Sequence, residues 1–204
     1  MHRQNPDPPS RSPESPLFVV GMPRSGTKLL RGLLTRHPRI RIPIYETEFL
    51  PQLARWVRER AIPHDEFAFE RMYRSVRHAP YFEYRKQDSP AFTWQGWREA
   101  CEGRFDATGL FEGFVRYETG TPRGSGIIWG DKSPTYIEHL PLLLALYPQA
   151  SIVHIVRDVR DQCVSLRKAF GKDLRRAAHR WNECVLAARR RAIRNTARFH
   201  EVKY

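Results

Sequence analysis

The chain has 204 residues, and its 35 Lys and Arg residues against 22 Asp and Glu residues give a formal net charge of +13. This length is enough for one domain with its own core. The charge favours an anionic partner but does not choose among nucleotide, nucleic acid, acidic polysaccharide and membrane surface. Three cysteines outside any CxxC pair argue against a disulfide scaffold or a zinc site, and no apolar segment is long enough to span a membrane. Because the cysteines fit a reduced compartment and the N-terminus lacks an apolar signal core, we predict a cytoplasmic protein.

The N-terminal part predicts a tail followed by a strand, a turn and a helix. Residues 1–16 are rich in Pro, Ser and Arg and cannot bury enough apolar surface to become ordered, so we predict a flexible tail and a domain over 17–204. Apolar residues 17–20 predict a buried strand, and a helix follows from Thr27 to about residue 36. The turn between them aims backbone N–H groups and the positive end of the helix dipole at one point, which suits a phosphate or a sulfate.

The middle of the chain predicts a helical insertion. Alternating isoleucines predict a second strand over 39–45, which brings Glu46 to its exit. Apolar residues at helical spacing then predict helices over 48–60, 64–77, 94–101 and 105–117. The stretch 79–91, with its prolines and aromatic residues, is predicted as a loop. We therefore expect a helical insertion over 48–121.

The remaining elements predict an α/β fold. A strand is expected over 127–130, a helix capped by Ser133 from Pro134 to about 147, a strand over 151–156, helices over 158–170 and 173–194, and a strand from 200. Strands separated by helices indicate three layers, in which a central parallel sheet is flanked by helices and ligands bind at the carboxyl ends of the strands. Since residue 204 falls within a predicted strand, we expect the domain to be C-terminally incomplete.

Polar side chains follow three of the predicted strands. The carboxyl ends of parallel strands meet at one edge, so these groups are expected to converge on one polyanion, with Glu46 as the nearby carboxylate. The groups are Arg24, Ser25, Gly26, Thr27 and Lys28 after the first strand, Lys132 after the strand at 127–130, and Arg157 after the strand at 151–156.

The turn is close to the P-loop of nucleoside triphosphatases but departs from it. Gly21 and Gly26 have the P-loop spacing, whereas Thr27 and Lys28 come in reversed order. Arg157 stands where such enzymes place an Asp for Mg²⁺. The residues thus favour cationic side chains in place of a metal. A P-loop nucleotide kinase stays an alternative that a magnesium requirement would support, and a noncatalytic nucleic-acid-binding module built on the basic helices is a second one.

The motifs resemble those of sulfotransferases that use 3′-phosphoadenosine 5′-phosphosulfate (PAPS). The sequence Pro-Arg-Ser-Gly-Thr at 23–27 looks like the 5′-phosphosulfate loop of that family. Asp-Lys-Ser-Pro-Thr-Tyr at 131–136 is similar to a segment of the carbohydrate and tyrosylprotein branches. Arg157 followed by Ser165 resembles the 3′-phosphate motif, and Tyr204 matches a tyrosine that lies against the nucleotide in the tyrosylprotein branch. The resemblance covers about 17–41 and 129–204.

This resemblance implies a P-loop-like fold and a function. PAPS would be the co-substrate, without a metal, and its sulfuryl group would pass to a hydroxyl of a glycan, a tyrosyl peptide or a small metabolite. Arg24 and Lys132 are then expected to stabilise the leaving phosphate, while Glu46, or alternatively Glu48, takes the proton of the acceptor. The insertion 48–121 would shape an acceptor pocket, for which the basic charge allows an acidic acceptor. No nucleic-acid partner is expected. The donor-binding residues implied are Arg24, Ser25, Gly26, Thr27, Lys28, Arg157, Ser165 and Tyr204.

The same residues also have ordinary structural interpretations. Glu46 could be an exposed acid placed before a helix, where the helix dipole favours it. Lys132 could be a solvated residue of a helix-capping turn. Arg157 could pair with the neighbouring Asp158.

Overall fold

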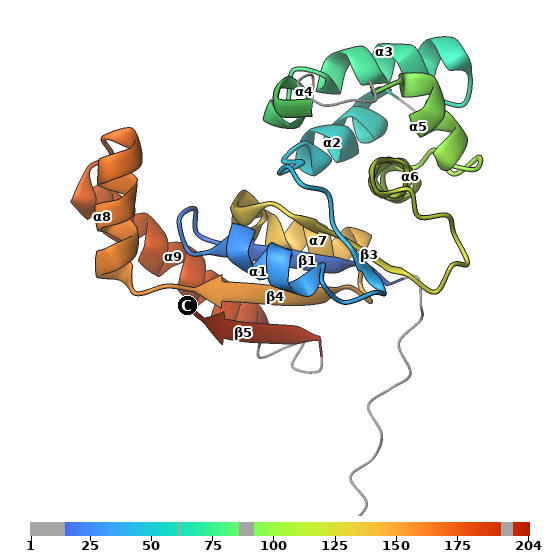
Figure 1. Ribbon diagram of the computed structural model, residues 1–204. Helices are drawn as coiled ribbons and strands as arrows, with labels where there is room; N and C mark the ends of the chain where they lie inside the picture. The colour runs from blue at the N-terminus through green and yellow to red at the C-terminus, as the bar shows by residue number, and fades with distance from the viewer. Residues whose placement is uncertain (1–14, 61, 86–91, 193–197) are drawn as a thin grey trace, which may run out of the picture.

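A five-stranded parallel sheet lies at the centre of the computed structural model, which describes residues 15–60, 62–85, 92–192 and 198–204 (Figure 1). The strand order is β2-β3-β1-β4-β5, and every neighbouring pair is parallel. The predicted α/β fold with a central parallel sheet is therefore confirmed. The strands are β1 (Leu17–Gly21), β2 (Ile40–Arg41), β3 (Ile128–Lys132), β4 (Ser151–Val156) and β5 (Phe199–Lys203).

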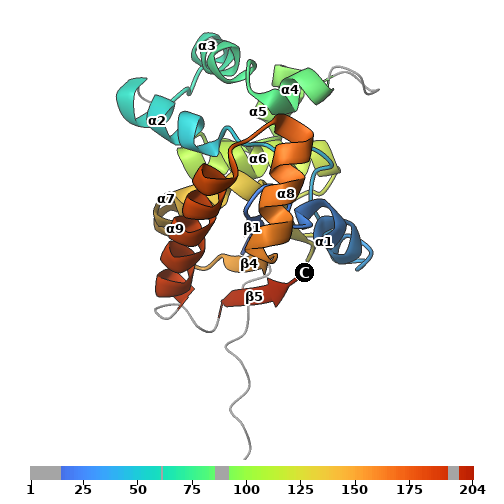
Figure 2. The ribbon, with the colours of Figure 1, turned by 90° about the vertical axis from the view of Figure 1, so that its left-hand side faces the viewer.

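Helices cover both faces of the sheet and one of its edges. Figure 2, which views the sheet from the carboxyl ends of its strands, shows α1 on one face, α7 and α9 on the other, and α2 to α6 gathered above. The helices are α1 (Thr27–Leu34), α2 (Leu50–Arg60), α3 (Glu66–Val76), α4 (Pro80–Arg85), α5 (Trp94–Ala100), α6 (Ala107–Thr119), the 3-10 helix η1 (Pro134–His139), α7 (Leu140–Leu146), α8 (Val159–Phe170) and α9 (Leu174–Ala192). Among the described residues, no helix is long and apolar enough to cross a membrane.

Strand β1 is buried on both faces because its neighbours on each side are apolar. Leu17 and Val19 belong to a small cluster with Leu34 of α1. Phe18 and Val20 point the other way, into the main core. Each fully buried side chain of this size contributes roughly 1.5–3 kcal/mol. Packing on both faces thus fixes the strand that leads into the predicted anion-binding turn.

The helices between β2 and β3 share an aromatic core. Phe49 and Phe114 meet edge to face with ring centroids 4.7 Å apart, and Phe69 meets Trp97 at 5.3 Å. All four side chains are almost fully buried. Phe114 belongs to α6, and Phe111 of the same helix stacks on Phe18 of β1. This contact joins the helical layer to the sheet. The segment after Glu46 is therefore held in a fixed place above the sheet edge.

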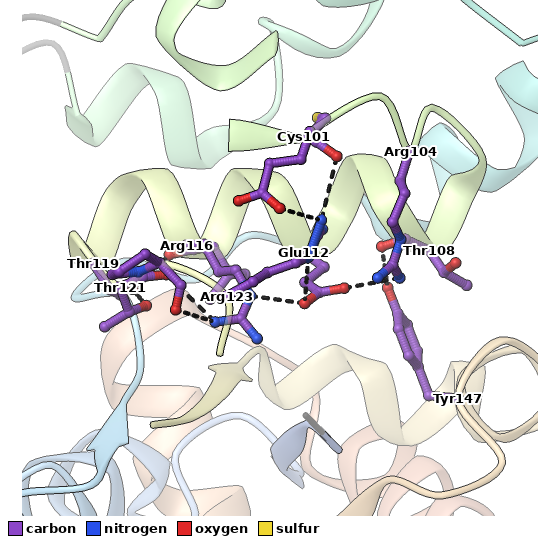
Figure 3. Close-up of polar contacts among 12 residues, drawn as sticks. Cys101, Arg104, Thr108, Glu112, Arg116, Thr119, Thr121, Arg123 and Tyr147 are labelled. Carbon is purple, nitrogen blue, oxygen red and sulfur yellow. Dashed lines mark hydrogen bonds and ion pairs between the residues drawn. The ribbon is translucent and has the colours of Figure 1, made fainter. Parts of the chain in front are cut away.

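A buried carboxylate ties α6 to the loops around it (Figure 3). Glu112 is only 5% exposed and accepts contacts from three guanidinium groups: Arg116 at 2.7 Å, Arg104 at 3.0 Å and Arg123 at 3.1 Å. Arg123 also donates to the backbone carbonyl of Cys101, at the end of α5. A buried charge of this kind is tolerated because it is paired and hydrogen-bonded.

Two predicted elements differ from the structure because of proline. The predicted loop at 79–91 contains α4, which begins at Pro80. Proline suits the first turn of a helix, and Tyr81 and Phe82 bury their rings. Residues 86–91 lie outside the described residues. The helix predicted from Ser133 to about 147 is instead η1 followed by α7, with Pro141, which lacks an N–H donor, at the junction.

Other boundaries shift at the ends of elements. The strand predicted over 39–45 is paired only at Ile40–Arg41, since Pro43 cannot donate to a ladder and the Ile44 side chain is 61% exposed. The predicted tail lies outside the described residues over 1–14, whereas Ser15 is buried and the Pro16 carbonyl accepts a hydrogen bond from the Ser151 amide. The helix predicted over 173–194 runs to Ala192, and 193–194 fall outside the described residues.

Candidate active site

A cavity of about 370 Å³ opens at the carboxyl end of the sheet. Its wall combines residues that follow β1, β2, β3 and β4. The adjacent strands β1 and β4 connect to helices on opposite faces of the sheet (Figure 2). Open α/β sheets form their ligand crevice at such a point. The lining residues are Pro23, Arg24, Gly26, Thr27, Lys28, Glu46, Pro134, Arg157, Phe170 and Tyr204. Sequence-predicted site residues that follow β1, β2, β4 and β5 thus share one cavity, whereas the predicted Ser25, Lys132 and Ser165 do not line it.

The turn between β1 and α1 is shaped for an anion. Arg24 and Gly26 both have positive φ, +71° and +89°, so the chain coils tightly before Thr27 begins α1. The Ser25 side chain is fully buried, and its hydroxyl has no hydrogen-bond partner among the described residues. A buried hydroxyl without a partner costs about 1–3 kcal/mol, and an anion oxygen bound in the turn would satisfy it.

The Arg24 side chain points toward α8. Its Nε donates to the Ser165 hydroxyl at 3.0 Å, and its backbone carbonyl accepts from Arg157 Nη1 at 3.2 Å. These three residues, which come from three different elements, therefore form one cluster. Among the described residues, no hydrogen bond joins Arg24 to Glu46 or Lys132.

Tyr204 closes the cavity against the turn. A Cβ atom at Gly26 would lie 2.4 Å from Cδ2 of the Tyr204 ring, so only glycine allows this approach. The Arg157 guanidinium carbon lies 5.0 Å from the centroid of the same ring, which is a cation–π distance. The Tyr204 amide donates to the carbonyl of Val156 at 2.9 Å and holds the residue in place. The ring is 60% exposed, so one of its faces is free for a ligand.

Lys132 and Glu46 form a close ion pair at the wall of the cavity, which Glu46 lines and Lys132 does not. The Lys132 ammonium lies 2.6 Å from Oε1 of Glu46. The Lys132 side chain is only 3% exposed, whereas that of Glu46 is 40% exposed. Lys132 is therefore not the solvated turn residue of the plainer interpretation. Glu46, half open to solvent, is the partner that a small molecule in the cavity can reach.

Glu48 lies near this pair but bonds to a different residue. Its backbone has a positive φ of 54°, and the Thr135 hydroxyl donates to its Oε1 at 3.0 Å. Burial raises the pKa of the Glu48 carboxyl above its ordinary value, although the Thr135 hydrogen bond opposes the rise. Unlike Glu46, Glu48 does not line the cavity.

A buried group of hydroxyls supports the loop that carries Glu46. The Thr47 hydroxyl lies 2.8 Å from the Tyr136 hydroxyl and 3.3 Å from that of Ser133. Tyr136 and Ser133 also accept the backbone N–H groups of Leu50 and Glu48, so they cap α2. Ser133 makes no side-chain cap bond to η1, the role predicted for it. This role of Thr47 was missed because its partners are distant in sequence and no local pattern marks it.

Asp131 lies beneath the ion pair and is fully buried. Burial raises the pKa of its carboxyl from 3.8 to about 7, while the nearby hydroxyls of Ser133 and Thr47 and the positive charge of Lys132 oppose the rise. The motif at 131–136 contained this residue, but the sequence pointed only to its neighbour Lys132.

Three further residues support or line the cavity: Gln162 and Trp181 hold its surroundings in place, and Phe170 lines it. Gln162, fully buried, donates from Nε2 to the Pro23 carbonyl at 2.9 Å and thereby ties α8 to the turn. Trp181 donates from its indole to the Arg157 carbonyl at 3.1 Å. Phe170, at the end of α8, contributes an apolar wall. A single buried glutamine or an exposed helix-end phenylalanine gives no local signal of such a role.

Comparison with known proteins places the chain among sulfotransferases. The model of the sulfotransferase family matches residues 16–204. The sulfotransferase domain of the olefin synthase of Synechococcus PCC 7002 aligns with a TM-score of 0.61 and 20% identity, over 99% of this chain and 70% of that one. Sulfotransferase STF9 of Mycobacterium avium aligns with a TM-score of 0.51 and 20% identity, over 95% of this chain and 59% of that one. At this identity the two structures establish the fold alone.

No curated protein matches the chain. The family model, however, spans nearly all of the described residues, from the first residue before β1 through Tyr204. The sulfotransferase structures share the arrangement of the sheet and its helices. The chain therefore belongs to the sulfotransferase family.

Proposed function

We propose that the protein transfers the sulfuryl group of PAPS to a hydroxyl of its acceptor. The observation that carries the proposal is that Glu46, which lines the cavity together with the anion-binding turn, pairs at 2.6 Å with the buried Lys132. The family match favours this chemistry over the nucleotide kinase and the nucleic-acid-binding module that the sequence left open. The three free cysteines among the described residues support the cytoplasmic location that we also propose.

The donor would lie across the turn and the start of α8. In this arrangement Ser25, Gly26, Thr27 and Lys28 bind the 5′-phosphosulfate. Arg157 and Ser165 bind the 3′-phosphate, and Tyr204 lies along the nucleotide. The fully buried, unsatisfied hydroxyl of Ser25 among the described residues supports the first part. The cation–π contact between Arg157 and Tyr204 supports the second, since it places a charge and a ring side by side.

Sulfuryl transfer needs little covalent help from a protein. The acceptor oxygen forms a bond to sulfur while the bond from sulfur to the 5′-phosphate oxygen breaks, and the geometry must hold the three atoms in line. Glu46 accepts the proton of the acceptor hydroxyl, because it lines the cavity and Glu48 does not. Lys132 stabilises the charge that gathers on the leaving phosphate. Arg24 can assist only after its guanidinium leaves Ser165, to which it is bonded at 3.0 Å.

Substitution of Lys132 tests the proposal. In assays with [³⁵S]PAPS and a panel of hydroxyl acceptors, Lys132→Ala is expected to lower the rate of transfer about a hundredfold or more, as the loss of one such donor does elsewhere. Lys168→Ala, at an exposed position of α8 outside the cavity, is the matched control and should retain the wild-type rate. Binding of the product 3′-phosphoadenosine 5′-phosphate (PAP) is measured in parallel. Wild-type protein that binds no PAP, or a Lys132→Ala variant with normal turnover, would contradict the proposal.

A further inference from the structure

A second cavity, of about 440 Å³, lies between α2 and α3 and shares no residue with the candidate active site. The two helices run side by side above the sheet (Figure 1), and the Gln52 side chain donates to the Ser75 carbonyl at 2.6 Å to join them. Arg55 and Arg60 come from α2 and Arg71 from α3, and all three are exposed. We call this cavity the α2–α3 pocket.

The charge of the α2–α3 pocket is unbalanced. Among the described residues, no carboxylate lies within ion-pair distance of Arg55, Arg60 or Arg71. Other arginines of the same helices are paired, with Arg58 at 3.5 Å from Glu59 and Arg74 at 2.8 Å from Glu70. Glu59 is the acid among the lining residues, and Arg58 already contacts it. Three guanidinium groups therefore remain available to an anionic ligand.

The walls of the α2–α3 pocket favour a ligand that is bound by side chains of the protein and not by its backbone. Both walls are helices, so the pocket offers no strand edge to an extended peptide. Guanidinium groups bind carboxylate and sulfate in a planar, two-pronged geometry. The edge of Trp56, which is 6% exposed, adds a small apolar contact to the floor. Charged sugar units meet these requirements.

The position of α2 relates the pocket to the reaction. The helix begins at Leu50, directly after the loop that carries Glu46. At 1.5 Å per residue, the lining from Gln52 to Arg60 extends about 12 Å along the helix, which suits a chain of several units. We propose that the α2–α3 pocket binds an acidic glycan, an oligosaccharide with uronate carboxylates or sulfate groups, as the distal part of the hydroxyl acceptor. The acceptor role rests on the proposed function, whereas the binding can be measured without it.

The test compares two double variants. Calorimetric titration with a hexasaccharide that carries uronate and sulfate groups should show binding to the wild-type protein. R55A/R71A is expected to weaken this binding roughly tenfold, since two exposed ion pairs and their hydrogen bonds are lost. R74A/R77A removes the same charge from the end of α3 outside the pocket and should change the affinity less than twofold. R55K/R71K, which keeps the charge, should retain part of the affinity.

The alternatives give different results. Equal losses in R55A/R71A and R74A/R77A would show a general charge effect and overturn the proposed binding at the pocket. The absence of hexasaccharide binding to folded wild-type protein would overturn it as well. An octaglutamate peptide that binds as tightly as the hexasaccharide, with the same loss in R55A/R71A, would overturn the glycan assignment. PAP affinity, measured on the same samples, should be unchanged in both double variants. Loss of PAP binding by the wild-type protein would instead count against the proposed function.

Discussion

Removal of the Asp131 carboxyl should stabilise the protein at neutral and alkaline pH. This side chain is fully buried, and burial raises its pKa from 3.8 to about 7. Between these two values the native protein holds a proton that the unfolded chain has already released. Stability contributed by this site therefore falls as pH rises, because the unfolded state binds fewer protons than the native state. The Asp131→Asn variant lacks the ionisation and should escape the loss.

The size of the effect follows from the two pKa values. Each pH unit between 3.8 and about 7 corresponds to about 1.4 kcal/mol, so the full cost of ionising Asp131 is about 4 kcal/mol. Part of this cost is already present at pH 5, since the unfolded chain is mostly ionised there. Between pH 5 and pH 8 the difference in unfolding free energy between Asp131→Asn and the wild type should therefore grow by about 2 to 3 kcal/mol in favour of the variant.

Urea denaturation at pH 5 and pH 8 measures this difference. The change in this difference between pH 5 and pH 8 reports the ionisation of the Asp131 carboxyl alone. Every other titrating group is common to both proteins, and the pH-independent effect of the amide cancels. A steady difference at the two pH values would refute the reasoning. It would mean that the carboxylate is stabilised in the native state as well as in water, with the hydroxyls of Ser133 and Thr47 fully offsetting the burial.

Two further substitutions test the core network and the turn. Glu112→Ala should lower the unfolding free energy by about 3–5 kcal/mol, since it leaves the buried Arg116 and its guanidinium neighbours without their carboxylate. Chemical denaturation measures the loss, and a change below 1 kcal/mol would contradict the prediction. Gly26→Ala should weaken PAP binding at least tenfold, because the new Cβ would meet the Tyr204 ring 2.4 Å away at a φ of +89°. Titration of PAP checks this, and Gly32→Ala, where a Cβ has open space, is the control.

The sequence predicts the parts of the structure whose signals are local. Residues 151–156 form β4 with the bounds that their apolar run indicates. The turn with Arg24 to Lys28 and the exits of β3 and β4 lie around one cavity, as expected for parallel strands. Helix α4 was missed because its formation depends on burial of Tyr81 and Phe82 in a core assembled from distant helices.

The candidate site shows the same division. Residue types and strand exits bring Lys132 and Glu46 to the same place, where they pair at 2.6 Å. The hydroxyls of Thr47 and Tyr136 come from segments far apart in the chain, so only the folded chain brings them together. The direction of the Arg24 side chain toward Ser165 is a rotamer, which a residue pattern does not encode.

The contact between Tyr204 and Gly26 links ligand release to the edge of the sheet. Among the described residues, strand β5 pairs only with β4, and four of its five residues are exposed. Edge strands with so little buried surface open at a low free-energy cost. In the arrangement that we propose for PAPS, fraying of β5 would withdraw the Tyr204 ring from the turn and uncover the nucleotide. Under the proposed function, local unfolding of this one strand would then set how long the spent donor stays bound.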